Sequence, residues 1–422
     1  KADSKPNAII NSWWDFGHWF KYWADRPVTF DGTSQNTPPA HWIGKVLLTD
    51  DEDLAVGILR MLDCSSREGF TTISELTKDG TEAIHIMYEI MPHNKKEAKK
   101  ILDAYFDDKD SEKILEKTHC EPPENYFITS EDMVGKSGVW GHFGSWDFDR
   151  ALIYNTLKKE EYEKDIDKST QFLKERFEFS HEDAENLYYE VQAITNSGQA
   201  NNWIAPWPGY AGSVGCSRDE DMLTCSNGFR IDLKNKEAFA ESPEGKVYPK
   251  KISFPTNEGI IVKEYNESVI NLQNGRSLGF ALIKKGENYE LLQMDSDLTA
   301  SMFTRLFYQE GIGLKYFKKF NEENSVVATF NGRKIIVWKI DWEGNETTII
   351  KAPEPEIEDK IVEDELESNI TNTEKDLQEI DNETNATDSE NDNVEIDNET
   401  TINETKETEN TTQQPDKEAN SS

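Results

Sequence analysis

The chain has 422 residues and a formal net charge of −36, with 82 acidic side chains against 46 basic ones. Its length permits two or three domains, each with a core of its own. Such an excess of negative charge argues against a nucleic-acid partner, because binding to a phosphate backbone requires a basic face. No apolar run approaches the ~18 to 20 residues that a membrane-spanning helix needs.

Near the N-terminus, aromatic side chains are concentrated in residues 12–23, where four tryptophans fall within eleven positions. Packing alone rarely requires so many tryptophans in so short a stretch. Trp13 and Trp14 offer two indole N–H donors, and Asp15 follows them with an anionic acceptor. A ligand hydroxyl both donates and accepts, so this trio can satisfy both of its hydrogen-bonding needs. The alternative interpretation is an aromatic helix that packs into a core, with Asp15 as its cap.

Residues 1–205 are predicted to form a mostly helical central core with one short β element. Thr37 followed by two prolines predicts a helix start with a hydroxyl cap. Apolar residues at i, i+4, i+7 and i+8 predict buried helical faces farther along, and Ser180 begins a sequence that resembles a capping box. The predicted helices are 40–48, one from about 51, one from 81, 95–106, 147–159 and one after 180–183, and the predicted strand is 126–129.

Residues 206–350 are predicted to form a β-rich insertion and peripheral module, because Pro and Gly break the helical pattern and short alternating runs follow. The spacing predicts a small antiparallel arrangement with one helix over 301–317, and Asn331-Gly332 is a strong signal for a closing hairpin turn. The fold class is therefore α+β. The predicted strands are 229–233, 251–254, 259–265, 277–284, 289–293, 326–330 and 334–340.

Residues 351–422 are predicted to be a disordered acidic tail. From residue 352 onward the tail has 24 Asp and Glu residues against four Lys and no aromatic residue, so it cannot bury enough surface to offset the entropy of ordering. It is also rich in Asn-x-Ser/Thr triplets. A composition of Asn, Glu and Thr produces such triplets by chance, and glycosylation of the tail is the alternative.

The four cysteines, Cys64, Cys120, Cys216 and Cys225, form no Cys-x-x-Cys pair, which argues against a structural zinc site. Cys216 and Cys225 flank a short polar loop and are the easiest pair to bridge, which leaves Cys64 with Cys120. Two disulfides would suit an extracytoplasmic location. Free buried thiols remain the alternative.

The stretch Trp-Trp-Asp-Phe-Gly at residues 13–17 closely resembles Trp-Trp-Asp-Tyr-Gly, the signature of the catalytic subunit of oligosaccharyltransferase. Residues 32–35 and 41–45 resemble its archaeal members. The resemblance implies that Trp13, Trp14 and Asp15 bind the hydroxyl of the Ser or Thr two positions after the acceptor asparagine. Sites built to hydrogen-bond a hydroxyl discriminate strongly against analogues that lack it.

The family has a second motif on a kinked helix, in the forms Asp-x-x-Lys-x-x-x-Met/Ile and Met-x-x-Ile. Residues 130–140 match it in a mixed form, with Met133, Lys136 and Trp140 at the spacing Met-x-x-Lys-x-x-x-Trp. The resemblance therefore assigns Met133 and Lys136 to sequon binding, with Asp132 and Trp140 as alternatives. A methyl contact from Met133 would favour Thr over Ser by about 1 kcal/mol. From the residues alone, a helix cap is the competing interpretation.

The resemblance also implies a reaction, the transfer of an oligosaccharide from a dolichyl phosphate or pyrophosphate carrier to the side-chain amide nitrogen of asparagine in acceptor polypeptides. In the family, a divalent metal (Mn or Mg) belongs mainly to a membrane portion that precedes the first motif, and we predict no catalytic or metal-binding residue in this chain. The expected protein is the extracellular C-terminal domain of a cell-membrane enzyme, inactive alone and in contact with the membrane through that portion. The alternative is a surface carbohydrate-binding module that uses the Trp cluster as a stacking platform.

Overall fold

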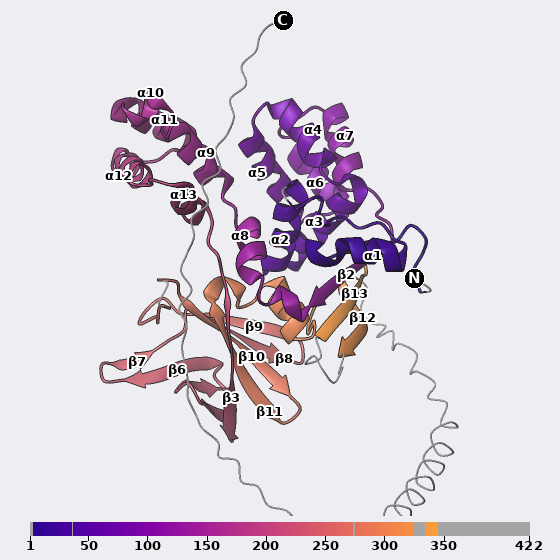
Figure 1. Ribbon diagram of the computed structural model, residues 1–422, viewed down its shortest axis with the longest axis vertical. Helices are drawn as coiled ribbons and strands as arrows, with labels where there is room; N and C mark the ends of the chain where they lie inside the picture. Colours follow the sequence, from indigo (N-terminus) through magenta and orange to yellow (C-terminus); the bar gives the residue numbers. More distant parts are fainter. Residues whose placement is uncertain (1–2, 36, 273–274, 325–333, 345–422) are drawn as a thin grey trace, which may run out of the picture. The chain divides into compact units, whose positions relative to one another are not determined.

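The computed structural model describes residues 3–35, 37–272, 275–324 and 334–344 (Figure 1). Within them the chain is α+β, which confirms the predicted class. The predicted tail 351–422, the strand 326–330 and the Asn331-Gly332 turn lie outside the described residues. In the described part, no helix is long and apolar enough to cross a bilayer.

Helices account for most of the first two hundred residues, and all six regions predicted as helical in 1–205 contain a helix that begins near the predicted position. Two further details differ from the expectations. The helix in 95–106 ends earlier than predicted, and the aromatic stretch begins with a 3₁₀ turn. The helices are η1 (Trp14–Phe16), α1 (Gly17–Ala24), α2 (Pro38–Leu48), α3 (Glu52–Ser65), α4 (Glu68–Thr77), α5 (Gly80–Ile90), α6 (Lys95–Leu102), α7 (Asp108–Thr118), η2 (Glu131–Met133), α8 (Ser137–Gly144), α9 (Phe148–Leu157), α10 (Glu160–Glu163), α11 (Ile166–Phe177), α12 (His181–Gln192), α13 (Ser197–Ile204), η3 (Ser296–Leu298) and the π-helix η4 (Thr304–Tyr308).

The strands form two sheets, one of four strands in the order β1-β2-β13-β12 and one of nine in the order β7-β6-β5-β4-β3-β11-β10-β8-β9. The strands are β1 (Ile9–Asn11), β2 (Asn125–Ser130), β3 (Tyr210–Asp219), β4 (Met222–Cys225), β5 (Arg230–Asp232), β6 (Glu237–Ser242), β7 (Gly245–Val247), β8 (Lys251–Thr256), β9 (Gly259–Glu264), β10 (Leu278–Lys285), β11 (Asn288–Asp295), β12 (Phe317–Asn324) and β13 (Lys334–Ile340).

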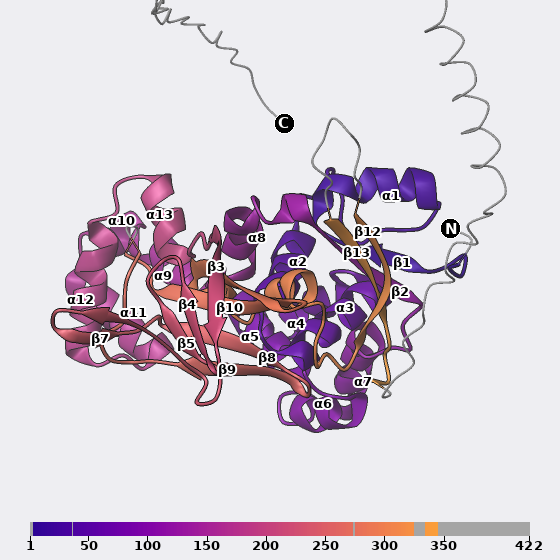
Figure 2. The ribbon, with the colours of Figure 1, turned by 90° about the horizontal axis from the view of Figure 1, so that it is seen from below.

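The four-stranded sheet joins parts of the chain that are far apart in sequence (Figure 2). β1 runs parallel to β2, with Ile9 opposite Asn125 and Asn11 opposite Phe127. On the other side of β2, β13 is antiparallel and pairs in turn with β12. All six residues of β2 are buried, so this strand lies at the centre of the main hydrophobic core. That core contains side chains from both sides of residue 205, and the predicted domain boundary there remains a prediction.

Helices α2 and α8 pack with their backbones in close contact. A Cβ atom added at Gly44 would lie 2.5 Å from the carbonyl oxygen of Trp140 and 2.8 Å from the backbone nitrogen of Gly144. Both are backbone atoms that cannot move aside like a flexible side chain. Glycine at these positions therefore sets the distance between the helix that follows the second motif and the helical core.

Both pairs of cysteines that the sequence favoured are disulfide-bonded in the structure. The Cys64–Cys120 bond links the end of α3 to the segment before β2. The Cys216–Cys225 bond joins paired positions of β3 and β4. No free cysteine is left in the chain.

Two predictions in the β-rich part were wrong in detail. The helix predicted over 301–317 reaches only to Tyr308, and positive φ values at Gly311 and Gly313 accompany the turn into β12. The nine-stranded sheet is not wholly antiparallel, because β10 and β8 pair in parallel. The ten-residue strand β3, which follows the break in the helical pattern after residue 205, was not predicted.

A local prediction at the start of α2 was also wrong. Thr37 precedes the helix, as predicted, but its hydroxyl donates to the carbonyl oxygen of Ser34 and does not cap α2. Ser180, in contrast, caps α12 through the backbone N–H of Asp183, as predicted.

A carboxyl group, Asp63, lies between two asparagines at the edge of the four-stranded sheet. It accepts hydrogen bonds from the amides of Asn11 on β1 and Asn125 on β2. Burial raises the pKa of Asp63 to about 7, and the two amide donors only partly oppose this effect. The side-chain oxygens of both asparagines are buried without a hydrogen-bond partner among the described residues.

We predict that Gly44→Ala destabilises the fold by about 1–3 kcal/mol, because the added methyl group overpacks the α2–α8 contact. The measurement is the free energy of unfolding from urea denaturation. Gly80→Ala is the matched control, since its Cβ would meet only the ring of Phe70 at 4.0 Å. Equal destabilisation by both substitutions would contradict the argument.

We predict that Asp63→Asn raises the free energy of unfolding, relative to the wild type, more at pH 8 than at pH 4.5. Between the unfolded pKa near 3.8 and the folded pKa of about 7, the folded state holds a proton that the unfolded state releases, so the wild-type free energy of unfolding falls as pH rises through this window. Removing the titration should change the mutant–wild-type difference by about 3 kcal/mol between the two pH values. Glu116→Gln, on the exposed face of α7, is the control, and its mutant–wild-type difference in free energy of unfolding should be the same at both pH values.

Candidate functional site

The two sequence motifs meet because they follow neighbouring parallel strands. Trp13 to Asp15 come directly after β1, and Asp132 to Lys136 come directly after β2. The carboxyl ends of adjacent parallel strands lie at the same edge of a sheet, so the loops that leave them are neighbours. Ser12 strengthens the contact, since its hydroxyl donates to the carbonyl oxygen of Ile128 at 2.9 Å.

The first two residues of the motif form an aromatic pair inside the domain. Trp13 is 1% exposed and stacks on the partly buried Trp14, with ring centroids 4.7 Å apart. Phe30 and Phe143 contact both rings. The indole Nε1 of Trp13 is buried without a hydrogen-bond partner among the described residues. A buried donor in this state is uncommon in folded proteins and marks a group with an unused capacity to bind.

Asp15, Asp132 and Lys136 form a charged cluster at the same place. The ammonium of Lys136 donates to Oδ1 of Asp15 at 2.6 Å and to Oδ2 of Asp132 at 3.0 Å. Burial lowers the pKa of Lys136, but the two carboxylates outweigh it and raise that pKa above its ordinary value. The second oxygen of Asp15, Oδ2, is buried and accepts no hydrogen bond from the described residues. The contacts of Lys136 thus leave Oδ2 of Asp15 without a hydrogen-bond partner among the described residues.

Met133 and Trp140 have a different environment from the charged cluster. Met133 is 1% exposed, and Trp140 is completely buried against Phe303. The indole N–H of Trp140 donates to the carbonyl oxygen of Met133 at 2.8 Å. The structure therefore brings Lys136 and Asp132 to Asp15, while Met133 and Trp140 belong to the core below them.

Lys136 stands between two helical segments of different geometry. The 3₁₀ turn η2 ends at Met133, and α8 begins at Ser137. The second motif is therefore a broken helix, as its kinked form in the resembled family implied. The break places Asp132 and Lys136 four residues apart on the side that faces Asp15.

Sequence reasoning missed Asp31, a buried carboxylate that packs against Gly17 of the first motif. Asp31 accepts hydrogen bonds from the Thr33 backbone and hydroxyl and from Lys21 on α1. Burial would raise the pKa of Asp31, but these donors, Lys21 first, lower it well below its usual range. A Cβ at Gly17 would lie 2.5 Å from Asp31, so the glycine of the first motif permits this contact. The sequence Asp-Gly-Thr-Ser at 31–34 was the available signal, since it is typical of an Asx turn.

His41 fixes the position of Phe143, which packs against Trp13 and Trp14. His41 on α2 donates from Nδ1 to the carbonyl oxygen of Phe143 at 2.8 Å and accepts at Nε2 from the Tyr88 hydroxyl at 2.6 Å. Burial lowers the pKa of His41 to about 4, so the ring is neutral at physiological pH and can make both bonds. Phe143 is thereby fixed against the two indoles.

The first motif leads into a helix with an exposed aromatic face. On α1, Trp19 is 59% exposed, Tyr22 is 75% exposed and Trp23 is 70% exposed.

Among the described residues, no group of three or more His, Cys, Asp or Glu side chains is placed to hold a metal ion. The first motif and its neighbours offer hydrogen bonding by indole and carboxylate groups.

We predict that Lys136→Met lowers the free energy of unfolding at pH 7 by about 1 kcal/mol, because Asp15 and Asp132 then face each other without a cation. Adding Asp15→Asn should restore part of the loss. In the wild type, this stabilisation is complete below pH 10.5 and is lost as pH rises through the raised pKa of Lys136. Lys164→Met removes an exposed ion pair and should have almost no effect.

Comparisons with known proteins agree with the motif. Residues 6–150 match the family model described as the STT3/PglB/AglB core domain. The chain is 41% identical over 149 residues to a dolichyl-phosphooligosaccharide-protein glycotransferase of Methanococcus voltae, and 39% identical over 155 residues to one of Methanocaldococcus jannaschii. These matches cover 34% and 35% of this chain and 16% and 17% of the relatives.

A solved structure, the C-terminal domain of C. jejuni PglB, aligns over 81% of this chain and 96% of its own, with a TM-score of 0.32 and 11% identity. We draw no argument from so low a score. Over residues 6–150 the chain thus matches the STT3/PglB/AglB core domain, which confirms its resemblance to archaeal oligosaccharyltransferase catalytic subunits.

Proposed function

We propose that this chain recognises the Ser or Thr of an Asn-x-Ser/Thr acceptor sequon for an oligosaccharyltransferase. The observation that carries the proposal is the pair of unpartnered buried polar atoms in one motif, the Nε1 donor of Trp13 and the Oδ2 acceptor of Asp15. Asp15 Oδ2 would accept from the threonine hydroxyl, and an indole N–H would donate to its oxygen. Because Trp13 is 1% exposed, binding at its Nε1 requires the neighbouring side chains to move.

In this proposal Lys136 and Asp132 are positioning residues for Asp15. The ammonium of Lys136 donates to Oδ1 of Asp15, so Oδ2 is the oxygen left for the ligand. Met133 is buried beneath this cluster, where it would reach a threonine methyl only through a rearrangement of its surroundings. Discrimination against a residue without a hydroxyl then comes from leaving a buried carboxylate oxygen unpaired.

The whole enzyme would transfer an oligosaccharide from a dolichyl phosphate carrier to the asparagine amide nitrogen of acceptor polypeptides. The relatives are named for this reaction, and the matches cover about a sixth of their length. A divalent ion, Mn²⁺ or Mg²⁺, would serve the reaction. As the family resemblance implies, we assign this ion to the membrane portion of the enzyme. The chain alone would bind acceptor and catalyse nothing.

We place the domain on the extracellular face of the cell membrane. Two disulfides support an oxidising compartment. The exposed indoles and phenol of α1 support a surface beside a membrane, where such amphipathic rings are favoured. Protease digestion of sealed cells tests this, since a domain that is protected from external protease would contradict the assignment.

The alternative, a carbohydrate-binding module built on the Trp cluster, needs an exposed stacking platform. Trp13 is buried, and Trp14 is partly buried against Trp13, Phe30 and Phe143, so the exposed indoles of the cluster are Trp19 and Trp23 on α1. We therefore do not propose this function for residues 13–15.

We predict that Asp15→Ala abolishes the preference for the sequon. The measurement is glycan transfer by the enzyme restored with its upstream membrane portion, with acceptor peptides that contain Asn-Ala-Thr or Asn-Ala-Val. The wild type should favour the Thr peptide by at least about a hundredfold, and the mutant should lose this ratio. Asp219→Ala, at the exposed end of β3, should keep it. A folded Asp15→Ala enzyme with an unchanged ratio would make residues 13–17 a packing motif.

A further inference from the structure

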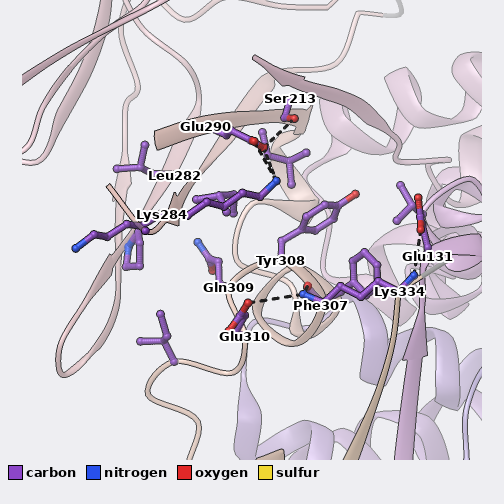
Figure 3. Close-up of a pocket in the computed structure, with 17 residues that line it drawn as sticks. Glu131, Ser213, Leu282, Lys284, Glu290, Phe307, Tyr308, Gln309, Glu310 and Lys334 are labelled. Atoms are coloured by element: carbon purple, nitrogen blue, oxygen red, sulfur yellow. Dashed lines mark hydrogen bonds and ion pairs between the residues drawn. The ribbon is translucent and has the colours of Figure 1, made fainter. Parts of the chain in front are cut away.

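A second cavity lies on the other side of the η2 turn, away from the Trp13–Lys136 site. It has a volume of about 670 Å³ and lies between the β10–β11 hairpin, the segment that follows η4 and the start of β13 (Figure 3). Sites for small ligands usually enclose about 300–1,000 Å³. Glu131 and Val134 from the η2 region form one of its walls. These two residues belong to the stretch 130–140, and the rest of the lining lies outside both motifs.

The cavity contains a buried amide with an unused acceptor. Gln309 lines it and is only 3% exposed. Its Nε2 donates to Oγ of Ser253 at 2.9 Å, and the Ser253 hydroxyl donates to the carbonyl oxygen of Thr299 at 3.0 Å. Because Ser253 has already given its proton to Thr299, the Gln309 amide is oriented with Nε2 toward Ser253. Its Oε1 is then left without a hydrogen-bond partner among the described residues.

A π-helix presents an aromatic ring and a phenol to the same cavity. In η4 (Thr304–Tyr308), Phe307 is buried and packs edge-on against Tyr308, with ring centroids 5.1 Å apart. Figure 3 shows the Tyr308 ring extending into the cavity. Burial raises the pKa of Tyr308, so its hydroxyl remains a donor at neutral pH. No hydrogen bond of this hydroxyl is made to the described residues. Single π-helical turns of this kind often occur at functional sites.

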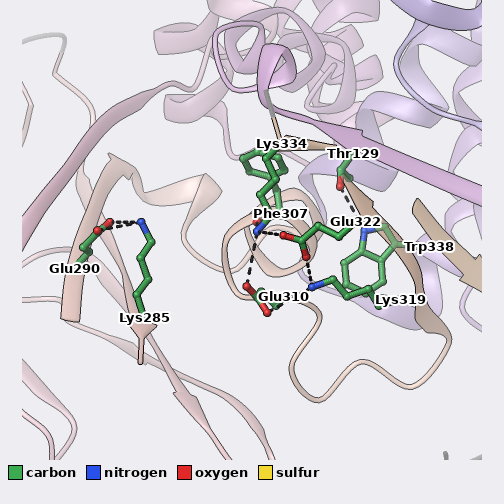
Figure 4. Close-up of polar contacts among 9 residues, drawn as sticks. All are labelled: Thr129, Lys285, Glu290, Phe307, Glu310, Lys319, Glu322, Lys334 and Trp338. Carbon is green, nitrogen blue, oxygen red and sulfur yellow. Dashed lines mark hydrogen bonds and ion pairs between the residues drawn. The ribbon is translucent and has the colours of Figure 1, made fainter. Parts of the chain in front are cut away.

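The charges around the cavity are balanced and largely paired. Three lysines and three glutamates line it, namely Lys284, Lys285, Lys334, Glu131, Glu290 and Glu310. Figure 4 shows Lys285 paired with Glu290 at 2.9 Å, and Lys334 in a network with Glu310 and Glu322. Lys334 also donates to the carbonyl oxygen of Phe307 at 3.4 Å, which ties the network to the π-helix. Such a lining has no net field to attract a phosphate or an acidic peptide.

We propose that this cavity binds a neutral saccharide. Sugars combine an apolar C–H face, which stacks on an aromatic ring, with hydroxyls that both donate and accept. Tyr308 supplies the ring and a donor, and Ile283 and Leu292, on the same face of the β10–β11 hairpin, supply an apolar wall. Gln309 Oε1 supplies a buried acceptor that a sugar hydroxyl reaches when the neighbouring side chains move. The proposal is independent of the sequon site, since Trp13, Asp15 and Lys136 do not line this cavity.

The experiment is isothermal titration calorimetry of the full chain with three neutral probes, triacetylchitotriose, maltotriose and mannotriose. We expect saturable binding of at least one probe in the millimolar range or tighter. Tyr308→Ala should weaken it at least tenfold, and Tyr308→Phe, which removes only the hydroxyl, about threefold. Tyr105→Ala, an exposed tyrosine outside the cavity, is the matched control and should leave affinity unchanged. Circular dichroism checks that each variant is folded.

Three outcomes would overturn the proposal: no saturable binding of any probe, equal affinity in folded Tyr308→Ala, or displacement of the sugar by a neutral Asn-Ala-Thr peptide. The last outcome would make the cavity a peptide site. Asp15→Ala should leave saccharide affinity unchanged. Failure of sequon recognition and failure of saccharide binding are therefore separate results.

Discussion

The candidate site depends on the parallel pairing of β1 with β2. These strands are separated by more than a hundred residues, and β1 pairs over only three positions. Parallel pairing places both carboxyl ends at one edge of the sheet, and each strand is followed at once by a 3₁₀ turn that carries one motif. An antiparallel arrangement would send the two motifs to opposite edges. The Ser12–Ile128 hydrogen bond and the asparagines around Asp63 stabilise this pairing from its two ends.

Two further contacts convert this proximity into a defined geometry. The glycine contact between α2 and α8 fixes the helix that follows Lys136, while His41 and Phe143 fix the wall behind the two indoles. Within that frame, Lys136 neutralises two carboxylates and yet leaves Asp15 Oδ2 and Trp13 Nε1 without partners. A fold optimised only for stability would pair or remove these atoms, because each unpaired buried polar group is costly. This cost is the physical reason to regard the cluster as a binding site rather than as a packing motif.

The β-rich part contributes to the same core and adds a separate cavity. β12 and β13 complete the small sheet, and Phe303, Phe307 and Trp338 pack in the main core with Trp13. Glu52 at the start of α3 accepts hydrogen bonds from the backbone of Lys315 and Tyr316, which joins the helical part to the chain before β12. The η2 region contributes to both places: Asp132 pairs with Lys136 at the first motif, and Glu131 lines the cavity.

The sequence by itself determined the α+β class, the helices with strong caps and apolar periodicity, most strands of the β-rich part, and the first motif, because these depend on local propensity and on neighbouring residues. It could not determine that β10 pairs in parallel with β8, or that the segment after residue 301 ends as a π-helix. Only the tertiary structure decided which second-motif residues face Asp15: Asp132 and Lys136 meet it, whereas Met133 and Trp140 are buried. It also decided that Trp13 is enclosed and that Asp31 and His41 support the site. These features arise from contacts between residues far apart in sequence, and no local pattern encodes the position of a distant partner.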